Sequence, residues 1–181
     1  MEPPRYESFT PLAQACDSGY INIVKTLLKA RADVNPHGEH FTPLTAAIKS
    51  ENFSIVKELL KAEADVNLKD EFNTPLTAAW DLAHVSVVKE LLQKGADVNL
   101  QDDFDTPLTA TCGRGHVSVV KELLQKSADV NLHGKVDTPL TSACTSGYLN
   151  IAKILLDVGS DVNMQDKKGN TPLYHAFVNT H

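Results

Sequence analysis

The chain has 181 residues, of which 42% are hydrophobic and 22% are charged, a composition typical of a folded soluble domain rather than a disordered segment. Its net charge of −6 argues against a nucleic-acid-binding protein, because affinity for phosphates depends on clustered Lys and Arg. The sequence contains no apolar run near the roughly 18 residues of a membrane span and no signal-peptide core at its start, so we expect an intracellular protein without membrane contact.

An internal repeat organises the whole chain. The triplet Thr-Pro-Leu recurs at intervals of 32, 32, 32, 32 and 33 residues, beginning at Thr10, Thr42, Thr74, Thr106, Thr138 and Thr171. The phrase Asp-Val-Asn recurs in step with it and ends at Asn35, Asn67, Asn99, Asn131 and Asn163. We therefore divide a single domain, residues 1–181, into units of about 10–41, 42–73, 74–105, 106–137 and 138–170, with a partial unit at 171–181.

The third unit shows the elements expected in every unit. Thr74 is a good N-cap and Pro75 suits the first helical position, which predicts a short first helix that runs to about Leu82. A second helix should follow from Val85, because apolar residues at offsets of 3, 6 and 7 form one face of a 3.6-residue period. Gly95 should end that helix, and a polar, turn-prone loop leads to the next unit.

Two helices of this length cannot bury their apolar faces alone, so neighbouring units must stack. We predict an all-α solenoid of five full repeats and a terminal half-repeat. The last unit stops at His181 after a first helix, which indicates a fragment of a longer array or an end that frays. The core positions expected to repeat are Leu44, Leu76, Leu108 and Leu140 on the first helices, and Val56, Val88 and Val120 on the second helices.

The residue that ends each second helix should have a left-handed backbone. Gly95 and Gly159 occupy this position in two units. Other units have a side chain there, namely Arg31, Glu63 and Ser127. Because the left-handed region is unfavourable by roughly 1–2 kcal/mol for residues with a side chain, we expect these three positions to be strained.

The three cysteines all stand six residues after a motif Thr, at Cys16, Cys112 and Cys144. A repeated position of this kind favours a small buried side chain over redox chemistry. An odd number of cysteines without metal-ligand spacing predicts reduced thiols rather than disulfides. Trp80, the only tryptophan, takes the same position in the third unit.

The two repeated phrases resemble the ankyrin-repeat family, whose unit of about 33 residues carries the signature Thr-Pro-Leu-His-x-Ala. The resemblance covers nearly the whole chain. It implies units of two antiparallel helices with a β-hairpin loop, and partner proteins that dock on the hairpin tips and on the concave first-helix face.

Two features depart from the family pattern. The loop between Asn and the next Thr has six residues in four junctions and seven only at 164–170, so most tips should be tighter than usual. The signature His is also replaced, so hydrogen bonding between units is expected to differ locally. The replacing residues are Ala13, Thr45, Thr77, Thr109, Thr141 and Tyr174.

The sequence offers little support for catalysis. It contains no glycine-rich phosphate loop, zinc-ligand spacing or nucleophile elbow. The stretch His37-Gly38-Glu39-His40 could hold a metal ion, but it lies in one variable loop without a supporting shell of residues. The Lys that recurs from Lys25 to Lys153 on the second helices is interpreted as part of a solvated face of mixed charge. We expect no catalytic residue, no cofactor and no metal site.

Variation between units is concentrated in the loops and at the ends of the first helices. Phe72, Phe104 and Val136 all stand two residues before a motif Thr, so stacking should place them in one row. We predict an apolar stripe whose acidic rim favours a partner segment with Lys or Arg. The alternative is that each side chain only packs on its neighbour. The candidate binding residues are Phe41, Phe72, Phe104, Val136, Glu71, Asp103, Asp105, Lys49, Asp81 and Arg114.

The repeated Asn most simply organises its own loop, because Asn side chains readily bond nearby backbone groups. The resemblance implies a modification as well. Ankyrin repeats are substrates of an asparaginyl hydroxylase that favours an Asn after an acidic-aliphatic pair, with a Leu eight residues earlier. The positions predicted for hydroxylation are Asn67, Asn99 and Asn131, which follow Leu59, Leu91 and Leu123 at that spacing.

These observations favour a non-catalytic module that binds another protein, either as a monomer or as a fragment of a longer array. The first alternative is a regulatory or targeting region of a larger enzyme or signalling protein whose catalytic part lies outside this chain. The second is a purely structural spacer, against which Phe41, Phe72 and Phe104 in the loops argue.

Overall fold

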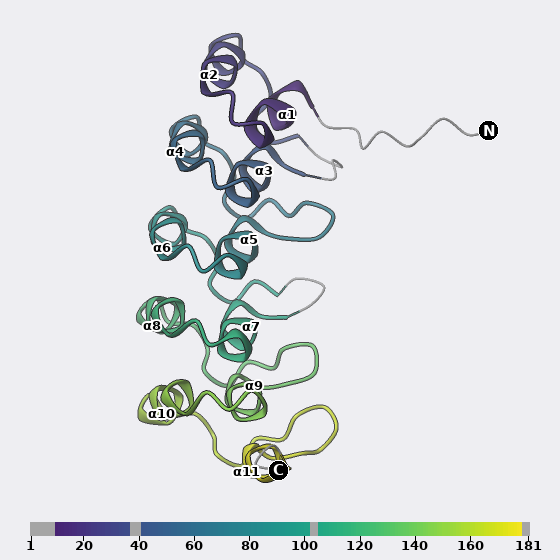
Figure 1. The fold of residues 1–181 in the computed structure, drawn as a ribbon, viewed down its shortest axis with the longest axis vertical. Coiled ribbons are helices and arrows are strands. Elements are labelled where there is room, and N and C mark those ends of the chain that lie inside the picture. The colour runs from purple at the N-terminus through teal and green to yellow at the C-terminus, as the bar shows by residue number, and fades with distance from the viewer. Residues whose placement is uncertain (1–9, 37–40, 102–104, 179–181) are drawn as a thin grey trace, which may run out of the picture.

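The computed structural model describes residues 10–36, 41–101 and 105–178, in which eleven helices alternate between two columns (Figure 1). The first helices of the units are α1 (Pro11–Asp17), α3 (Pro43–Lys49), α5 (Pro75–Asp81), α7 (Pro107–Arg114), α9 (Pro139–Thr145) and α11 (Pro172–Val178). The second helices are α2 (Ile21–Lys29), α4 (Phe53–Lys61), α6 (Val85–Gln93), α8 (Val117–Gln125) and α10 (Leu149–Asp157). Five helix pairs and a last single helix form the all-α solenoid that the repeat predicts.

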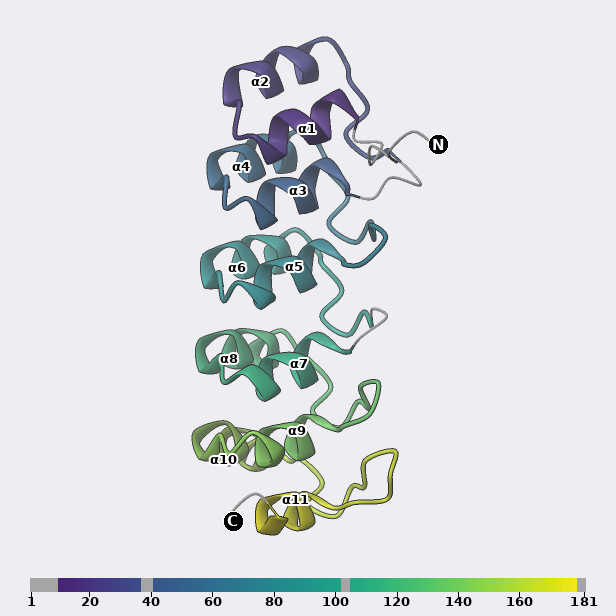
Figure 2. The ribbon, with the colours of Figure 1, turned by 45° about the vertical axis from the view of Figure 1, so that its right-hand side comes forward.

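The loops between units project to one side, beyond the column of first helices (Figure 2). Backbone N–H groups close three of these loops onto carbonyl oxygens, from Asp70 to Asn73 (2.9 Å), Gly134 to Asp137 (2.8 Å) and Asp166 to Asn170 (2.9 Å). The first two turns are one residue shorter than the third, so the shorter loops do have tighter tips. A β-hairpin was expected at each tip, but the described residues contain no strand, because a single backbone bond closes each of these turns.

The first helices begin at the Pro that follows the motif Thr, as predicted. In α5 the Thr77 N–H donates to Thr74 Oγ1 (3.1 Å), while the Thr74 N–H donates to Thr77 Oγ1 (2.7 Å). Thr138 and Thr141 form the same reciprocal capping box in α9. The Thr that replaces the signature His therefore satisfies a backbone group at the start of its own helix.

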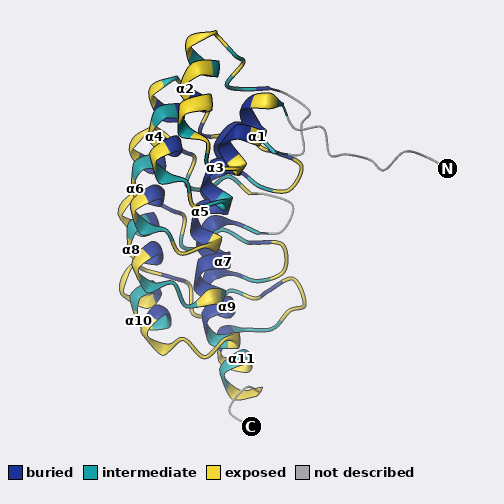
Figure 3. Cartoon of the chain, turned by 45° about the horizontal axis from the view of Figure 1, so that its top comes forward, coloured by how far each residue is buried: buried dark blue, intermediate teal, exposed yellow. Residues whose placement is uncertain are grey.

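The second helices depend on packing, since none of them has a side-chain cap at its start. Their inner faces are buried and their outer faces exposed (Figure 3). The predicted core residues are confirmed: Leu44, Leu76, Leu108, Leu140, Val56, Val88 and Val120 are each 2% exposed or less and belong to one continuous core. Within the described residues, every helix is too short or too polar to span a bilayer.

The Asp-Val-Asn phrases link consecutive units. The Asp97 N–H donates to Asn67 Oδ1 (2.8 Å), and Asn67 Nδ2 donates to Gly95 O (3.2 Å). The same backbone donation joins Asp65 to Asn35 (2.8 Å), Asp129 to Asn99 (2.9 Å) and Asp161 to Asn131 (2.9 Å). We call these four links the Asn–Asp ladder. Asn was predicted to organise its own loop; its side chain instead bonds the next unit, and the Asp65 carboxylate accepts the Asn67 N–H (2.8 Å) within the unit.

The left-handed positions predicted at the ends of the second helices are confirmed. The backbone φ is 61° at Arg31, 61° at Glu63 and 64° at Ser127. Gly95 and Gly159, at the same position in their units, have φ values of 89° and 92°. Three residues with side chains therefore adopt a backbone conformation that favours glycine.

A second series of left-handed residues lies in the turn between the two helices of each unit, and sequence reasoning missed it. Gly19, Gly115 and Gly147 occupy this turn in three units with φ between 73° and 80°. Glu51 (φ 58°) and Ala83 (φ 56°) occupy it in the other two units. The sequence does indicate this second series, because three of the five units have glycine at this position.

Replacing Glu63 with Gly should raise the free energy of unfolding by up to about 1 kcal/mol, because glycine removes the left-handed strain while its greater unfolded-state freedom offsets part of the gain. Gly95→Ala should lower that free energy by a similar amount, since a Cβ there meets nothing within 4 Å and only the backbone conformation opposes it. Urea denaturation measures both changes. A lower midpoint for Glu63→Gly would contradict the assignment.

Candidate functional site

Two of the predicted binding residues lie together in the loops that precede α3 and α5. The ring centroids of Phe41 and Phe72 are 6.4 Å apart. Lys49 Nζ lies 4.3 Å from the Phe41 centroid and 6.0 Å from the Phe72 centroid, which is the range of cation–π attraction. Phe72 is 41% exposed and Phe41 is half-buried. Stacking thus brings aromatic residues of successive units together, with a cation from the first helix over them.

A buried carboxylate orders this cluster. Asp70 accepts hydrogen bonds from the backbone N–H groups of Phe72 (2.8 Å) and Asn73 (2.6 Å), which holds the Phe72 loop in place. Burial lowers the pKa of Lys49, and the negative charges of Asp70 and Asp81 act in the opposite direction. Sequence reasoning missed Asp70, although an Asp that precedes a tight turn commonly accepts hydrogen bonds from the turn backbone.

A second cluster joins α5 to α7. The Arg114 guanidinium carbon lies 4.6 Å from the Trp80 ring centroid, and Arg114 Nη2 lies 3.0 Å from Asp81 Oδ1. Trp80 is buried, whereas the Arg114 and Asp81 side chains are about half exposed. Asp81 and Arg114 were predicted as separate contacts at the first-helix ends. The structure pairs them, and Trp80, which sequence reasoning did not include in the site, supports the cation.

The remaining apolar and acidic candidates belong to the loops before α5, α7 and α9. Val136 is 38% exposed, and its carbonyl oxygen accepts the Lys167 N–H (2.9 Å) of the next loop. Glu71 is exposed. Asp103 and Phe104 lie outside the described residues, so the predicted row is seen only at Phe72 and Val136.

The acidic rim lies partly between the loops rather than at their tips. Asp105 is half-buried and accepts the Thr106 N–H (2.9 Å) at the start of α7. A Cβ at Gly134 would meet the Asp105 carboxylate, so the two loops approach each other closely at this point. Of the described acidic candidates, Glu71 and Asp81 are exposed.

Within the described residues, one group of side chains has the composition of a metal site. The ligand atoms of Asp137, Asp166 and His175 lie within 4.8 Å of one another. Their present bonds are structural, because His175 Nε2 lies 2.8 Å from Asp166 Oδ2 and the same carboxylate accepts the Lys168 and Asn170 N–H groups. Burial alone would raise the pKa of Asp166, but these hydrogen bonds outweigh it and lower the pKa to about 2. Burial raises the pKa of Asp137.

The cysteine thiols are poor nucleophiles. All three are unpaired. Burial raises the pKa of Cys16 to about 12, with the nearby Asp17 charge adding to the effect, and burial also raises the pKa values of Cys112 and Cys144. A thiol with a raised pKa is protonated at neutral pH and does not act as a thiolate. The stretch 37–40, considered above for metal binding, lies outside the described residues.

The asparagines predicted for hydroxylation all belong to the Asn–Asp ladder. Asn67 is exposed, whereas Asn99 and Asn131 are half-buried. The side-chain oxygen of each accepts a backbone N–H of the next unit, so all three side chains are held in the ladder.

The helix pairs stack, and the residues that differ between units lie on the loops and at the ends of the first helices. This arrangement defines a helical repeat protein with one extended, varied surface. The family model described as ankyrin repeats in three copies matches residues 12–102, 76–166 and 136–181. The chain therefore belongs to the ankyrin-repeat family. A search of curated proteins gives no match. Ankyrin repeats are generally protein–protein interaction modules and are typically non-catalytic.

Asp166→Asn should lower the free energy of unfolding at neutral pH, because a carboxylate with a lowered pKa stabilises the folded state when ionised. That contribution is complete above the ordinary pKa of 3.8 and is lost as the pH falls through about 2. The urea midpoints of the two proteins should therefore converge as the pH is lowered from about 5 to about 2. The exposed Asp157→Asn is the control, and a gap that stays constant over this range would refute the role of Asp166.

Proposed function

We propose that this array binds another protein through its loops and first-helix ends and has no catalytic activity of its own. The two cation–aromatic clusters carry this proposal, with Lys49 over Phe41 and Phe72, and Arg114 over Trp80. Aromatic residues and Arg are enriched among the residues that dominate binding energy. Intramolecular contacts already order both clusters, so association would cost little side-chain entropy.

We propose a partner segment that combines an apolar side chain, placed against Phe72, with a Lys or Arg near Glu71. Phe72 supplies exposed aromatic surface and Glu71 an exposed negative charge beside it. The net charge of −6 supports a protein partner over a nucleic acid or an anionic membrane surface. Three unpaired cysteines support a reducing, intracellular location, and a monomeric array would leave the whole surface available.

Site-specific photocrosslinking tests the location of this surface. A photoreactive residue in place of Phe72 should crosslink to a partner, whereas the same residue in place of Lys121, exposed on the outer face of α8, should not. Phe72→Ala should weaken capture of that partner by about tenfold or more. It should change the free energy of unfolding by no more than about 0.5 kcal/mol, because the residue lies at the surface.

Ile23→Ala is the matched control for that substitution, because Ile23 is an exposed apolar residue, 50% exposed, on a second helix. The Ile23→Ala variant should capture the partner as well as the unaltered chain does. Unchanged capture with Phe72→Ala, together with lost stability, would show that Phe72 only packs on its neighbours and would contradict the proposed surface.

Hydroxylation of Asn67, Asn99 and Asn131 is a further proposal, supported by the Leu and Asp-Val spacing quoted above. Incubation with an asparaginyl hydroxylase should add one oxygen atom to each of these residues, detected by peptide mass spectrometry. Absence of the oxidised peptides, under conditions in which a control ankyrin substrate is modified, would rule the proposal out.

A further inference from the structure

Three metal-ligating side chains converge beside α11. Asp137 comes from the loop before α9, Asp166 from the loop before α11, and His175 from α11 itself. Their ligand atoms all lie within 4.8 Å of one another. The Asp166 side chain is 1% exposed and the His175 side chain 16% exposed, so the group lies largely away from solvent. Three separate segments of the chain therefore present ligand atoms to one point.

The Asp166 carboxylate is held in a fixed orientation. Its Oδ1 accepts the backbone N–H groups of Lys168 (2.8 Å) and Asn170 (2.8 Å). Its Oδ2 lies 2.8 Å from His175 Nε2, and the Asn170 side-chain amide donates to the same oxygen over 3.3 Å. Carboxylates that bind metal ions are fixed by surrounding hydrogen bonds in the same way. Asp166 is thus anchored to the backbone through one oxygen and directs the other toward His175.

The Asp137 carboxylate has no such anchor. It is half-buried and faces the Asp166 carboxylate, yet it accepts no hydrogen bond within the described residues. Burial raises the pKa of Asp137, and so does the charge of Asp166, whereas His175 and Lys168 lower it. Two carboxylates that share a site repel each other, and a cation between them removes the repulsion. A bound cation would therefore account for the position of Asp137, which no hydrogen bond in the described part of the chain explains.

Other junctions between units lack this set of side chains. The equivalent positions one unit earlier hold Asp105, Gly134 and Ser142, and the junction before α5 holds Phe41, Asp70 and Ala78. A Cβ added at Gly134 would meet the Asp105 carboxylate, so the fold brings these two loop positions together in that junction as well. The repeat therefore supplies the geometry, whereas the combination of two carboxylates and an imidazole is specific to the junction at α11.

The ligand set fits a divalent transition-metal ion. Mg²⁺ and Ca²⁺ take oxygen ligands, whereas an imidazole nitrogen together with carboxylates suits Zn²⁺ and its neighbours in the first transition row. Ligand atoms of a tetrahedral zinc site lie about 3.4 Å apart, since each is about 2.1 Å from the ion. The three atoms here lie within 4.8 Å of one another, so small rotations of the Asp137 and His175 side chains would close the site.

We propose that Asp137, Asp166 and His175 bind one Zn²⁺ ion. The ion takes an oxygen from each carboxylate and Nε2 from the neutral His175 ring, and water completes its coordination. The ring proton then resides on Nδ1, and the contact between Nε2 and Asp166 is replaced by bonds from both groups to the ion. The ion ties the loop before α9 to α11, so its binding stabilises the folded array. The sequence predicted no metal site because the three ligands come from separate segments.

Isothermal titration calorimetry of the full chain, with zinc chloride as the probe, tests the site. Binding should saturate at one ion, and EDTA should reverse the accompanying rise in Tm. Asp137→Asn should weaken binding at least about tenfold, because loss of even an outer hydrogen-bond partner of a ligand costs about 10–100-fold. Asp105→Asn, the same substitution at the same position one unit earlier, should leave the affinity unchanged.

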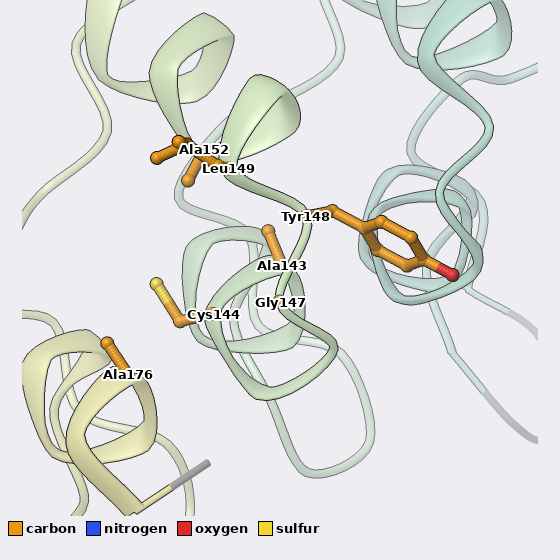
Figure 4. Close-up of a pocket in the computed structure, with 7 residues that line it drawn as sticks. All are labelled: Ala143, Cys144, Gly147, Tyr148, Leu149, Ala152 and Ala176. Carbon is orange, nitrogen blue, oxygen red and sulfur yellow. The ribbon is translucent and has the colours of Figure 1, made fainter. Parts of the chain in front are cut away.

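Two controls exclude other ligands. Cys144 lies across a pocket from Ala176, the residue after His175 (Figure 4). Co²⁺ in place of Zn²⁺ should therefore give visible d–d absorption without a thiolate charge-transfer band, and Cys144→Ser should bind zinc as the unaltered chain does. Joint replacement of His37 and His40 by Ala should also leave the affinity unchanged.

Thermal unfolding without metal checks that each variant folds, and His175→Ala is a second variant that should lose zinc binding. Absence of saturable binding would overturn the proposal, and so would equal affinity for Asp137→Asn and the unaltered chain. Loss of binding on replacement of His37 and His40 would assign the ion to that stretch instead. None of the three ligands belongs to the Phe72 surface, so the zinc site and the proposed partner surface can fail independently.

Discussion

The Asn side chains of the first four Asp-Val-Asn phrases each accept a hydrogen bond from the backbone of the next unit, and the rest of the structure depends on these links. No unit is stable alone, because a seven-residue helix such as α9 and a nine-residue helix such as α10 are too short to persist without packing. The Asn–Asp ladder holds neighbouring units in one register. That register then brings together residues from different units, such as Phe41 with Phe72 and Trp80 with Arg114.

Positions that recur in every unit stabilise the array, and positions that vary form the surface proposed for recognition. Second helices, capping threonines and the ladder recur almost unchanged, and they build a core that is continuous along the array. Loop tips and first-helix ends differ from unit to unit, and there Lys49 and Arg114 are held over aromatic rings. Because the scaffold fixes each loop at its base, a change at a tip alters the surface without altering the fold.

The fold was predictable from sequence because it depends on local rules: Thr-Pro starts a helix, and an apolar period of 3.6 defines its buried face. Even the strained backbone of Glu63 followed from glycines in sister units. The site was less predictable because it depends on distances between units. Sequence singled out Asp81 and Arg114 but not their ion pair, and the Asp166–His175 contact joins a loop to a helix through space.

The most direct test of this account compares Asn99→Ala with Asn163→Ala by urea denaturation. Asn99 accepts the Asp129 N–H (2.9 Å) of the next unit, whereas the Asn163 side chain makes no such link within the described residues. We predict that Asn99→Ala lowers the free energy of unfolding by about 1 kcal/mol. Asn163→Ala should change it by less than about 0.5 kcal/mol. Equal losses for the two substitutions would contradict the ladder as the link that sets the register of the array.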